Sequence, residues 1–218
     1  MFRESLEMFR STRSRTMALA DQLSQEQLNF TPATGKWSPG EVLDHLLRAE
    51  RVNRDQIAEL ITLRKSQQKP FVKRTFADMN VSVAYIPKSL LPIFEVPFTL
   101  LNTFVPVGFR EFITRNRLVP AQSPDIAIPR RGRSATDLRE ELASSFAETE
   151  NLFNANPDLD YGEMSIQHPL MGTNSVPELL RFMAFHEQRH QNQINNIIAS
   201  PQFPRPQSSG KGAPHVKL

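Results

Sequence analysis

Histidine is the residue type with the widest chemical scope in this 218-residue chain. The chain contains five histidines and no cysteine. The lack of cysteine excludes disulfide scaffolds, thiolate zinc sites, cysteine nucleophiles and iron–sulfur clusters. Any metal ion must therefore be held by imidazole, carboxylate or carbonyl groups. Three of the histidines, His45, His186 and His190, fall inside segments with helical periodicity.

His186 and His190 lie one turn apart on one face of an expected helix, between Met183 and Ile194 on the same apolar stripe. His45 lies on the apolar stripe of another helical segment. Three inward imidazoles are costly unless their ring nitrogens have partners. A divalent metal ion would satisfy all three, because an i, i+4 pair supplies two ligands and a facing helix supplies the third. The alternative is three hydrogen-bonded core histidines without a metal.

The H-E-x-x-H pattern at residues 186–190 also matches the zinc metalloprotease signature. The extended form of that signature requires Gly and His where this chain has Gln193 and Asn196. Residues 191–218 contain no Asp or Glu that could serve as a downstream ligand, and no nearby strand pattern offers a substrate-binding edge. We therefore reject the metalloprotease interpretation.

Four segments have the apolar periodicity and start signals of long helices. They run over about 2–23, 38–65, 134–156 and 175–199. The second and fourth begin with S-x-x-E capping boxes, and the third begins with a capping serine. Because no strand pattern is convincing, the sequence predicts an all-α fold, a four-helix bundle.

The segment 70–133 differs in composition from the helices around it. Eight of the 17 prolines lie here, with five phenylalanines between residues 94 and 112. Short helices fit only between the prolines, at 88–104 and 108–117. We expect a partly ordered crossover between the second and third helices, which could run parallel. The favoured interpretation is that this crossover covers one end of the core. The alternatives are a lid or pocket wall and, least favoured, a membrane-contacting hairpin.

A single bundle domain over 1–200, with that crossover as an insertion, accounts for most of the chain. Residues 201–218, rich in Pro, Ser, Gly and Lys, are expected to form a flexible tail. The net charge of +3 is small for a dedicated nucleic-acid binder. The N-terminus lacks the apolar core of a signal peptide, and the longest uncharged apolar stretch, 96–109, is shorter than the about 20 residues of a membrane span. We expect a cytoplasmic protein without nucleic-acid or membrane partners.

Two motifs resemble those of the DinB-like family of metal-binding four-helix proteins. They are Trp37-Ser38-x-x-Glu41-x-x-x-His45-Leu46 and His186-x-x-x-His190-x-x-Gln193-Ile194, and the loop His168-Pro169-x-x-Gly172 is also similar. The resemblance covers about 1–200 and implies one divalent metal ion, often zinc or nickel, on His45, His186 and His190 with an open coordination position. It also implies thiol-dependent S-transferase or isomerase chemistry, with bacillithiol, mycothiol or a similar low-molecular-weight thiol. The segment 70–133 is longer than is usual in the family.

Three neutral ligands would leave the metal its full charge, so an open site would act as a Lewis acid. It could lower the pKa of a bound water or hold a thiol as thiolate. Because the chain has no cysteine, a thiol nucleophile would arrive with the small-molecule substrate. The resemblance favours metal-activated thiol attack on a small electrophile, with hydrolysis second. Two other functions stay open: a non-catalytic module that binds a metal or small ligand, and a purely structural bundle. A homodimer is also possible from the sequence. No catalytic residue is assigned.

Supporting roles are open to several residues near the motifs. Glu41 lies one turn before a candidate ligand, but its capping role is favoured. Glu187 points about 100° away from the preceding histidine, which favours a surface or supporting position over a catalytic base. Gln193 could orient a ligand or bond across the bundle, and His168 could line the site or be structural. The basic run 130–133 is expected to be a solvated loop, with an anionic cofactor contact as the alternative.

Overall fold

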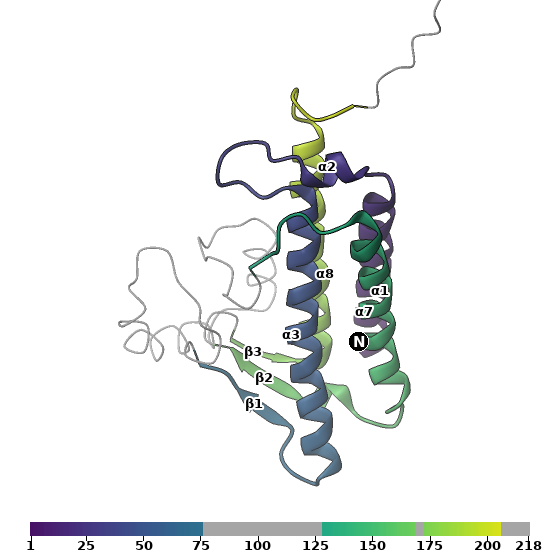
Figure 1. Ribbon diagram of the computed structural model, residues 1–218. Helices are drawn as coiled ribbons and strands as arrows, with labels where there is room; N and C mark the ends of the chain where they lie inside the picture. Colours follow the sequence, from purple (N-terminus) through teal and green to yellow (C-terminus); the bar gives the residue numbers. More distant parts are fainter. Residues whose placement is uncertain (76–127, 169–171, 206–218) are drawn as a thin grey trace, which may run out of the picture.

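The computed structural model describes residues 1–75, 128–168 and 172–205 of the chain (Figure 1). In chain order the elements are α1 (Phe2–Asp21), α2 (Gln25–Asn29), α3 (Pro39–Lys65), β1 (Phe71–Lys73), α7 (Ala135–Asn154), a 3-10 turn (Tyr161–Glu163), β2 (Ser165–His168), β3 (Gly172–Ser175) and α8 (Val176–Ile198). The described part of the chain is therefore mostly helical, and the four long helices expected from the sequence are present. The five-residue α2 was not predicted.

The helix starts follow the capping signals in the sequence. At α3, Ser38 Oγ accepts a hydrogen bond from the backbone N–H of Glu41, and the Glu41 carboxylate accepts one from the backbone N–H of Ser38 at 2.9 Å. At α8, the Glu178 carboxylate accepts a hydrogen bond from the backbone N–H of Ser175 at 2.7 Å. The side chain of Ser134 caps α7. These caps fix the first residue of each helix and hence the face on which each later residue lies.

Each long helix packs against two others. α1 contacts α7 and α8, and α3 contacts the same two helices, so the four lie side by side (Figure 1). In the figure α3 and α7 run in the same direction, which the long connection between them permits. Most of the predicted crossover 70–133, with its short helices at 88–104 and 108–117, lies outside the described residues, as does the tail after residue 205. No helix in the described ranges is long and apolar enough to cross a membrane.

The described residues also include strands, for which the sequence showed no convincing pattern. Three short strands form a small sheet in the order β1-β2-β3, in which β1 pairs parallel with β2 and β2 pairs antiparallel with β3. β1 packs on α3, and β3 continues directly into α8, so the sheet joins the ends of these two helices. Strands of three or four residues are too short for an alternating pattern to stand out in the sequence.

In the described part of the chain, the apolar core forms two separate clusters. One lies on the sheet side and includes Phe9, Ile57, Val72, Phe153, Ile166 and Leu180. The other lies on the side of α2 and includes Leu28, Val42, Leu43, Leu138, Leu142 and Ile194. Between them, each long helix contributes a buried polar side chain. We call the set Arg13 of α1, Glu50 of α3, Ser145 and Thr149 of α7, and Glu187 of α8 the polar layer.

Candidate metal centre

The side chains of His45 on α3 and of His186 and His190 on α8 converge. The Nε2 atom of His186 lies 3.3 Å from Nε2 of His45 and 3.2 Å from Nε2 of His190. One ligand atom from each ring lies within 4.8 Å of the other two. His45 and His190 are buried, and His186 is half-buried. The structure thus brings together the three histidines whose spacing placed them on facing stripes.

The spacing of the ring nitrogens fits a single metal ion. Zinc binds imidazole nitrogen at about 2.0–2.1 Å in tetrahedral geometry, which separates neighbouring ligand atoms by about 3.3 Å. The two close Nε2 pairs have this separation. Hydrogen bonds among the three rings would not account for both contacts. A neutral imidazole carries only one N–H, whereas Nε2 of His186 lies close to two other nitrogen atoms. The three side chains could therefore hold a metal ion.

Gln193 fixes the tautomer of His190. Nδ1 of His190 lies 2.8 Å from Oε1 of Gln193. A carbonyl oxygen can only accept, so Nδ1 carries the hydrogen and donates it. Nε2 of the neutral ring then directs its lone pair toward the other two histidines. The contact runs along α8 rather than across the helices, and it is the kind of contact by which a residue orients a ligand.

The environment keeps His186 in its neutral form. Burial disfavours the imidazolium and lowers the pKa of His186 well below its usual value, and the neighbouring His190, His45 and Arg189 lower it further. Neutral imidazole is the form that binds a metal ion. At neutral pH this ring therefore needs to release no proton before it can act as a ligand.

Two half-buried aromatic side chains pack on the imidazole rings. The ring centroid of Trp37 lies 5.0 Å from that of His45 and 6.3 Å from that of His190, stacked on the latter. Phe182 stacks on His186 with centroids 6.0 Å apart. These contacts restrict rotation of the imidazoles, and their apolar surface strengthens electrostatic interactions at the site. Helical spacing alone did not reveal the contacts of Trp37, because it precedes the helix.

The basic loop before α7 is anchored beside the histidines. Asp44 is buried and accepts hydrogen bonds from the backbone N–H of Arg130 at 2.7 Å and from Arg133 at 2.9 Å, while Arg131 donates to Glu41 at 2.7 Å. Burial alone would raise the pKa of Asp44, but hydrogen bonds from Arg130, Arg48 and Arg133 outweigh it and lower the pKa. The loop is exposed at Arg130 and Arg131, as expected, yet the guanidinium groups of Arg131 and Arg133 already bind the protein's own carboxylates. Glu41 therefore has its predicted capping role and a second role in this anchor.

Glu187 does not lie at the surface. Its side chain faces away from the histidines, as the helical phase predicted, but the residue as a whole is only 1% exposed. Its carboxylate accepts a hydrogen bond from Nε of Arg13 at 2.8 Å. The surface alternative for this residue is therefore wrong, because α1 covers the side of α8 on which Glu187 lies.

His168 lies outside the histidine cluster, at the end of β2. Within the described ranges, the group that could hold a metal ion consists of the other three histidines. His168 is half-buried, and burial lowers its pKa to about 4. The structure thus shows His168 in a small sheet that the sequence did not predict.

Acidification should reveal the burial of His168. Its pKa is about 6.5 in the unfolded chain and about 4 in the folded protein, so the unfolded chain gains the proton first as the pH falls. Stability is therefore lost between about pH 6.5 and pH 4, by about 1–2 kcal/mol at pH 5 for this half-buried group. Urea unfolding at pH 7 and pH 5, with a chelator present, should show a smaller loss for His168→Gln. Equal losses in the two proteins would contradict the expected pKa.

Comparison with known families identifies the family of the chain. The sequence model of the DinB superfamily matches residues 8–194. The chain belongs to the DinB superfamily. The DinB-superfamily match includes all three clustered histidines and most of the described fold, and it confirms the resemblance seen in the two motifs. Neither a curated protein nor a solved structure matches the chain.

Proposed function

We propose that this DinB-superfamily protein binds one divalent transition-metal ion through His45, His186 and His190. We further propose that it uses the ion to activate a low-molecular-weight thiol, or else water, for attack on a small electrophile. The main support is the convergence of three Nε2 atoms from two helices at separations that suit a tetrahedral ion. Zinc and nickel are the expected ions, because the resemblance to the DinB-like family implies them and both accept imidazole ligands.

The residues of the site suit this chemistry. When bound, the metal supplies a positive charge that lowers the pKa of a thiol or a water. Neutral imidazole ligands would leave that charge intact, and Gln193 holds His190 in the tautomer that presents Nε2. Trp37 and Phe182 limit ring rotation. Because the chain has no cysteine, thiol attack requires a thiol co-substrate.

We expect this site to lie in a four-helix bundle in which the segment 70–133 is the crossover or lid. The expected partner is a small-molecule substrate, in the cytoplasm, without nucleic acid or membrane. A homodimer is compatible with these expectations. The metal, the co-substrate and the electrophile are all parts of the proposal.

Metal removal tests the proposal directly. Tag-free protein should contain about one equivalent of zinc or nickel by plasma mass spectrometry, as expected for a single three-histidine site. Stripping the metal with dipicolinate should abolish turnover of a chromogenic electrophile with a supplied thiol, and adding zinc or nickel back should restore it. Thiol consumption can be followed with a thiol reagent, because the cysteine-free protein contributes no background.

Each outcome of this assay has a distinct meaning. Metal-dependent loss of electrophile without added thiol would indicate hydrolysis by activated water. Stoichiometric metal with no turnover of any electrophile would indicate a non-catalytic metal-binding module. An absence of metal, even after reconstitution, would contradict the proposed function.

A further inference from the structure

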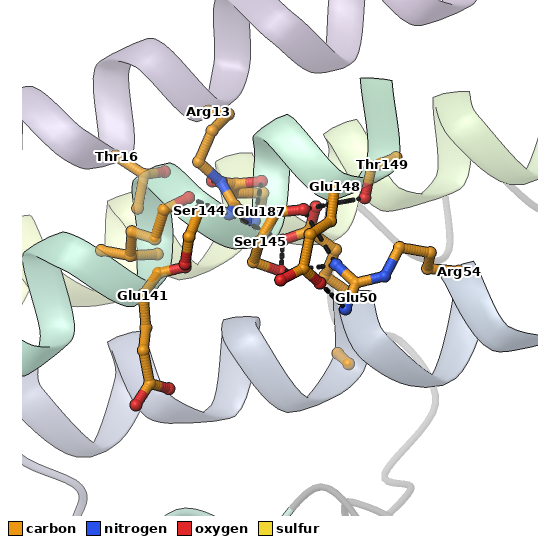
Figure 2. Close-up of polar contacts among 12 residues, drawn as sticks. Arg13, Thr16, Glu50, Arg54, Glu141, Ser144, Ser145, Glu148, Thr149 and Glu187 are labelled. Atoms are coloured by element: carbon orange, nitrogen blue, oxygen red, sulfur yellow. Dashed lines mark hydrogen bonds and ion pairs between the residues drawn. The ribbon is translucent and has the colours of Figure 1, made fainter. Parts of the chain in front are cut away.

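Arg13 of α1 connects the two helices that carry the clustered histidines (Figure 2). Its Nε donates a hydrogen bond to Glu187 of α8 at 2.8 Å, and its Nη1 donates one to Glu50 of α3 at 2.7 Å. A second bond from Nη2 to Glu187 at 3.3 Å makes that contact bidentate. Ser145 and Thr149 of α7 each lie 2.8 Å from a carboxylate oxygen of Glu50. All four long helices therefore meet in the polar layer.

The polar layer places charged side chains in the core of the protein. The side chains of Arg13 and Glu50 are each only 1% exposed, and that of Glu187 is 2% exposed. Burial alone would lower the pKa of Arg13, but the two carboxylates outweigh it and raise the pKa, so the guanidinium stays charged. Two carboxylates thus share the guanidinium of Arg13 between two apolar clusters, and Ser145, which donates to Glu50, also accepts a hydrogen bond from Arg54 at 3.0 Å.

Stability alone gives no good reason for this arrangement. Apolar residues of similar volume often replace a buried ion pair without loss of stability, because desolvation offsets the attraction between the charges. A buried charged cluster does, however, raise the free energy of arrangements in which the helices pack in a wrong register. If one helix rotates or slides by a turn, a charge is left buried without its partner. The best-attested role of such groups is to specify register.

The same two helices must be in register for the histidines to meet. Glu187 lies between His186 and His190 in the sequence of α8, and Glu50 lies five residues after His45 on α3. Successive residues of a helix are about 100° apart, so fixing one side chain fixes the direction of its neighbours. A metal site tolerates displacements of only about 0.5 Å from its productive geometry. One guanidinium that holds both carboxylates thus sets the rotation of both ligand-bearing helices.

We propose that Arg13, Glu50 and Glu187 are positioning residues of the metal centre. They hold α3 and α8 in the rotation and register at which the three Nε2 atoms meet. This inference rests on the proposed function only in that the histidines bind a metal ion, and it requires no particular reaction.

Arg13→Lys is the main test variant. Lysine keeps the positive charge but loses the planar fork that binds Glu187 through two nitrogens. Arg139→Lys is the matched control, because Arg139 also connects helices. It donates from α7 to the backbone carbonyls of Ala20 at 3.2 Å and Leu23 at 2.9 Å, and its hydrogen bonds reach only α1 and the turn after it.

The readout is metal binding by the full chain, measured without any substrate. Zinc affinity is determined by competition with a chromophoric chelator, and coordination geometry by the visible spectrum of the cobalt-loaded protein. Both are measured at a temperature at which circular dichroism shows each variant to be folded. Arg13→Lys should bind zinc about 10–100-fold more weakly and change the cobalt spectrum, as for other residues that support metal ligands. Arg139→Lys should stay within about twofold of wild type, because its contacts are separate from the site.

A folded Arg13→Lys protein with wild-type zinc affinity and an unchanged cobalt spectrum would overturn the inference. If Arg13→Lys does not fold, Thr149→Val serves instead, since it removes one partner of Glu50 with little change of shape. A weaker zinc site in that variant supports the inference, and wild-type affinity overturns it. Wild-type protein that binds no zinc would instead contradict the proposed function, so the two failures are distinguishable.

Discussion

His45→Ala should weaken zinc binding by more than about 100-fold, since loss of a ligand should cost more than loss of a residue that only supports one. The variant retains two candidate ligands, His186 and His190, on a single helix. Zinc at about 1,000 times its dissociation constant should stabilise the wild type by about 4 kcal/mol. The same zinc concentration should stabilise His45→Ala far less. Competition titration and thermal unfolding with and without zinc measure the two effects.

His168→Ala is the matched control for this experiment. It also removes a histidine, but one that lies outside the cluster. Its zinc affinity should equal that of the wild type, even though its pH dependence of stability should differ. Tight stoichiometric zinc in His45→Ala, or equal weakening in both variants, would show that the metal does not bind at the histidine cluster.

Arg13→Met should lower the free energy of unfolding of the metal-free protein by about 3–5 kcal/mol, because it leaves two buried carboxylates without their counter-charge. Arg10 provides the comparison, since it lies three residues earlier on the same helix and also pairs with carboxylates, those of Glu7 and Glu150. Its side chain is 46% exposed, so Arg10→Met should cost less than about 1 kcal/mol. Urea unfolding followed by circular dichroism at pH 7, with a chelator present, measures both.

A combined variant separates stability from positioning. Replacing Arg13, Glu50 and Glu187 together by apolar residues of similar volume should recover most of the stability lost in Arg13→Met. Its zinc affinity should nevertheless stay below that of the wild type, because the register of α3 and α8 is no longer specified. An Arg13→Met protein as stable as Arg10→Met would show that the buried contacts of Arg13 contribute little to folding.

The long helices could be predicted because their signals are local. The capping box of Ser38 and Glu41 is complete within four residues, and the spacing of His186 and His190 fixes their common face whatever lies opposite. The convergence of these two rings with His45 needed only one further fact, that α3 and α8 pack together. The family motifs supplied that expectation.

The polar layer could not be predicted, because its signals are not local. Arg13 lies four residues after the buried Phe9, so helical phase places it on the inner face of α1, but the sequence does not show that Glu50 and Glu187 meet it there. The helical phase of Glu187 gave the direction of its side chain but not the helix opposite. β1 was missed for a similar reason, since its pairing partner β2 lies far away along the chain, whereas β2 and β3 are neighbours in sequence but too short to show an alternating pattern.

The position of Trp37 gives the molecule an optical probe of its own site. It is the single tryptophan of the chain, and its ring packs on two of the three clustered imidazoles. The tryptophan fluorescence of the protein therefore arises beside the proposed metal site. An open-shell ion such as nickel or cobalt quenches a neighbouring indole, whereas closed-shell zinc changes only its surroundings. Fluorescence of the unlabelled protein can thus follow occupancy in real time and distinguish these two kinds of ion.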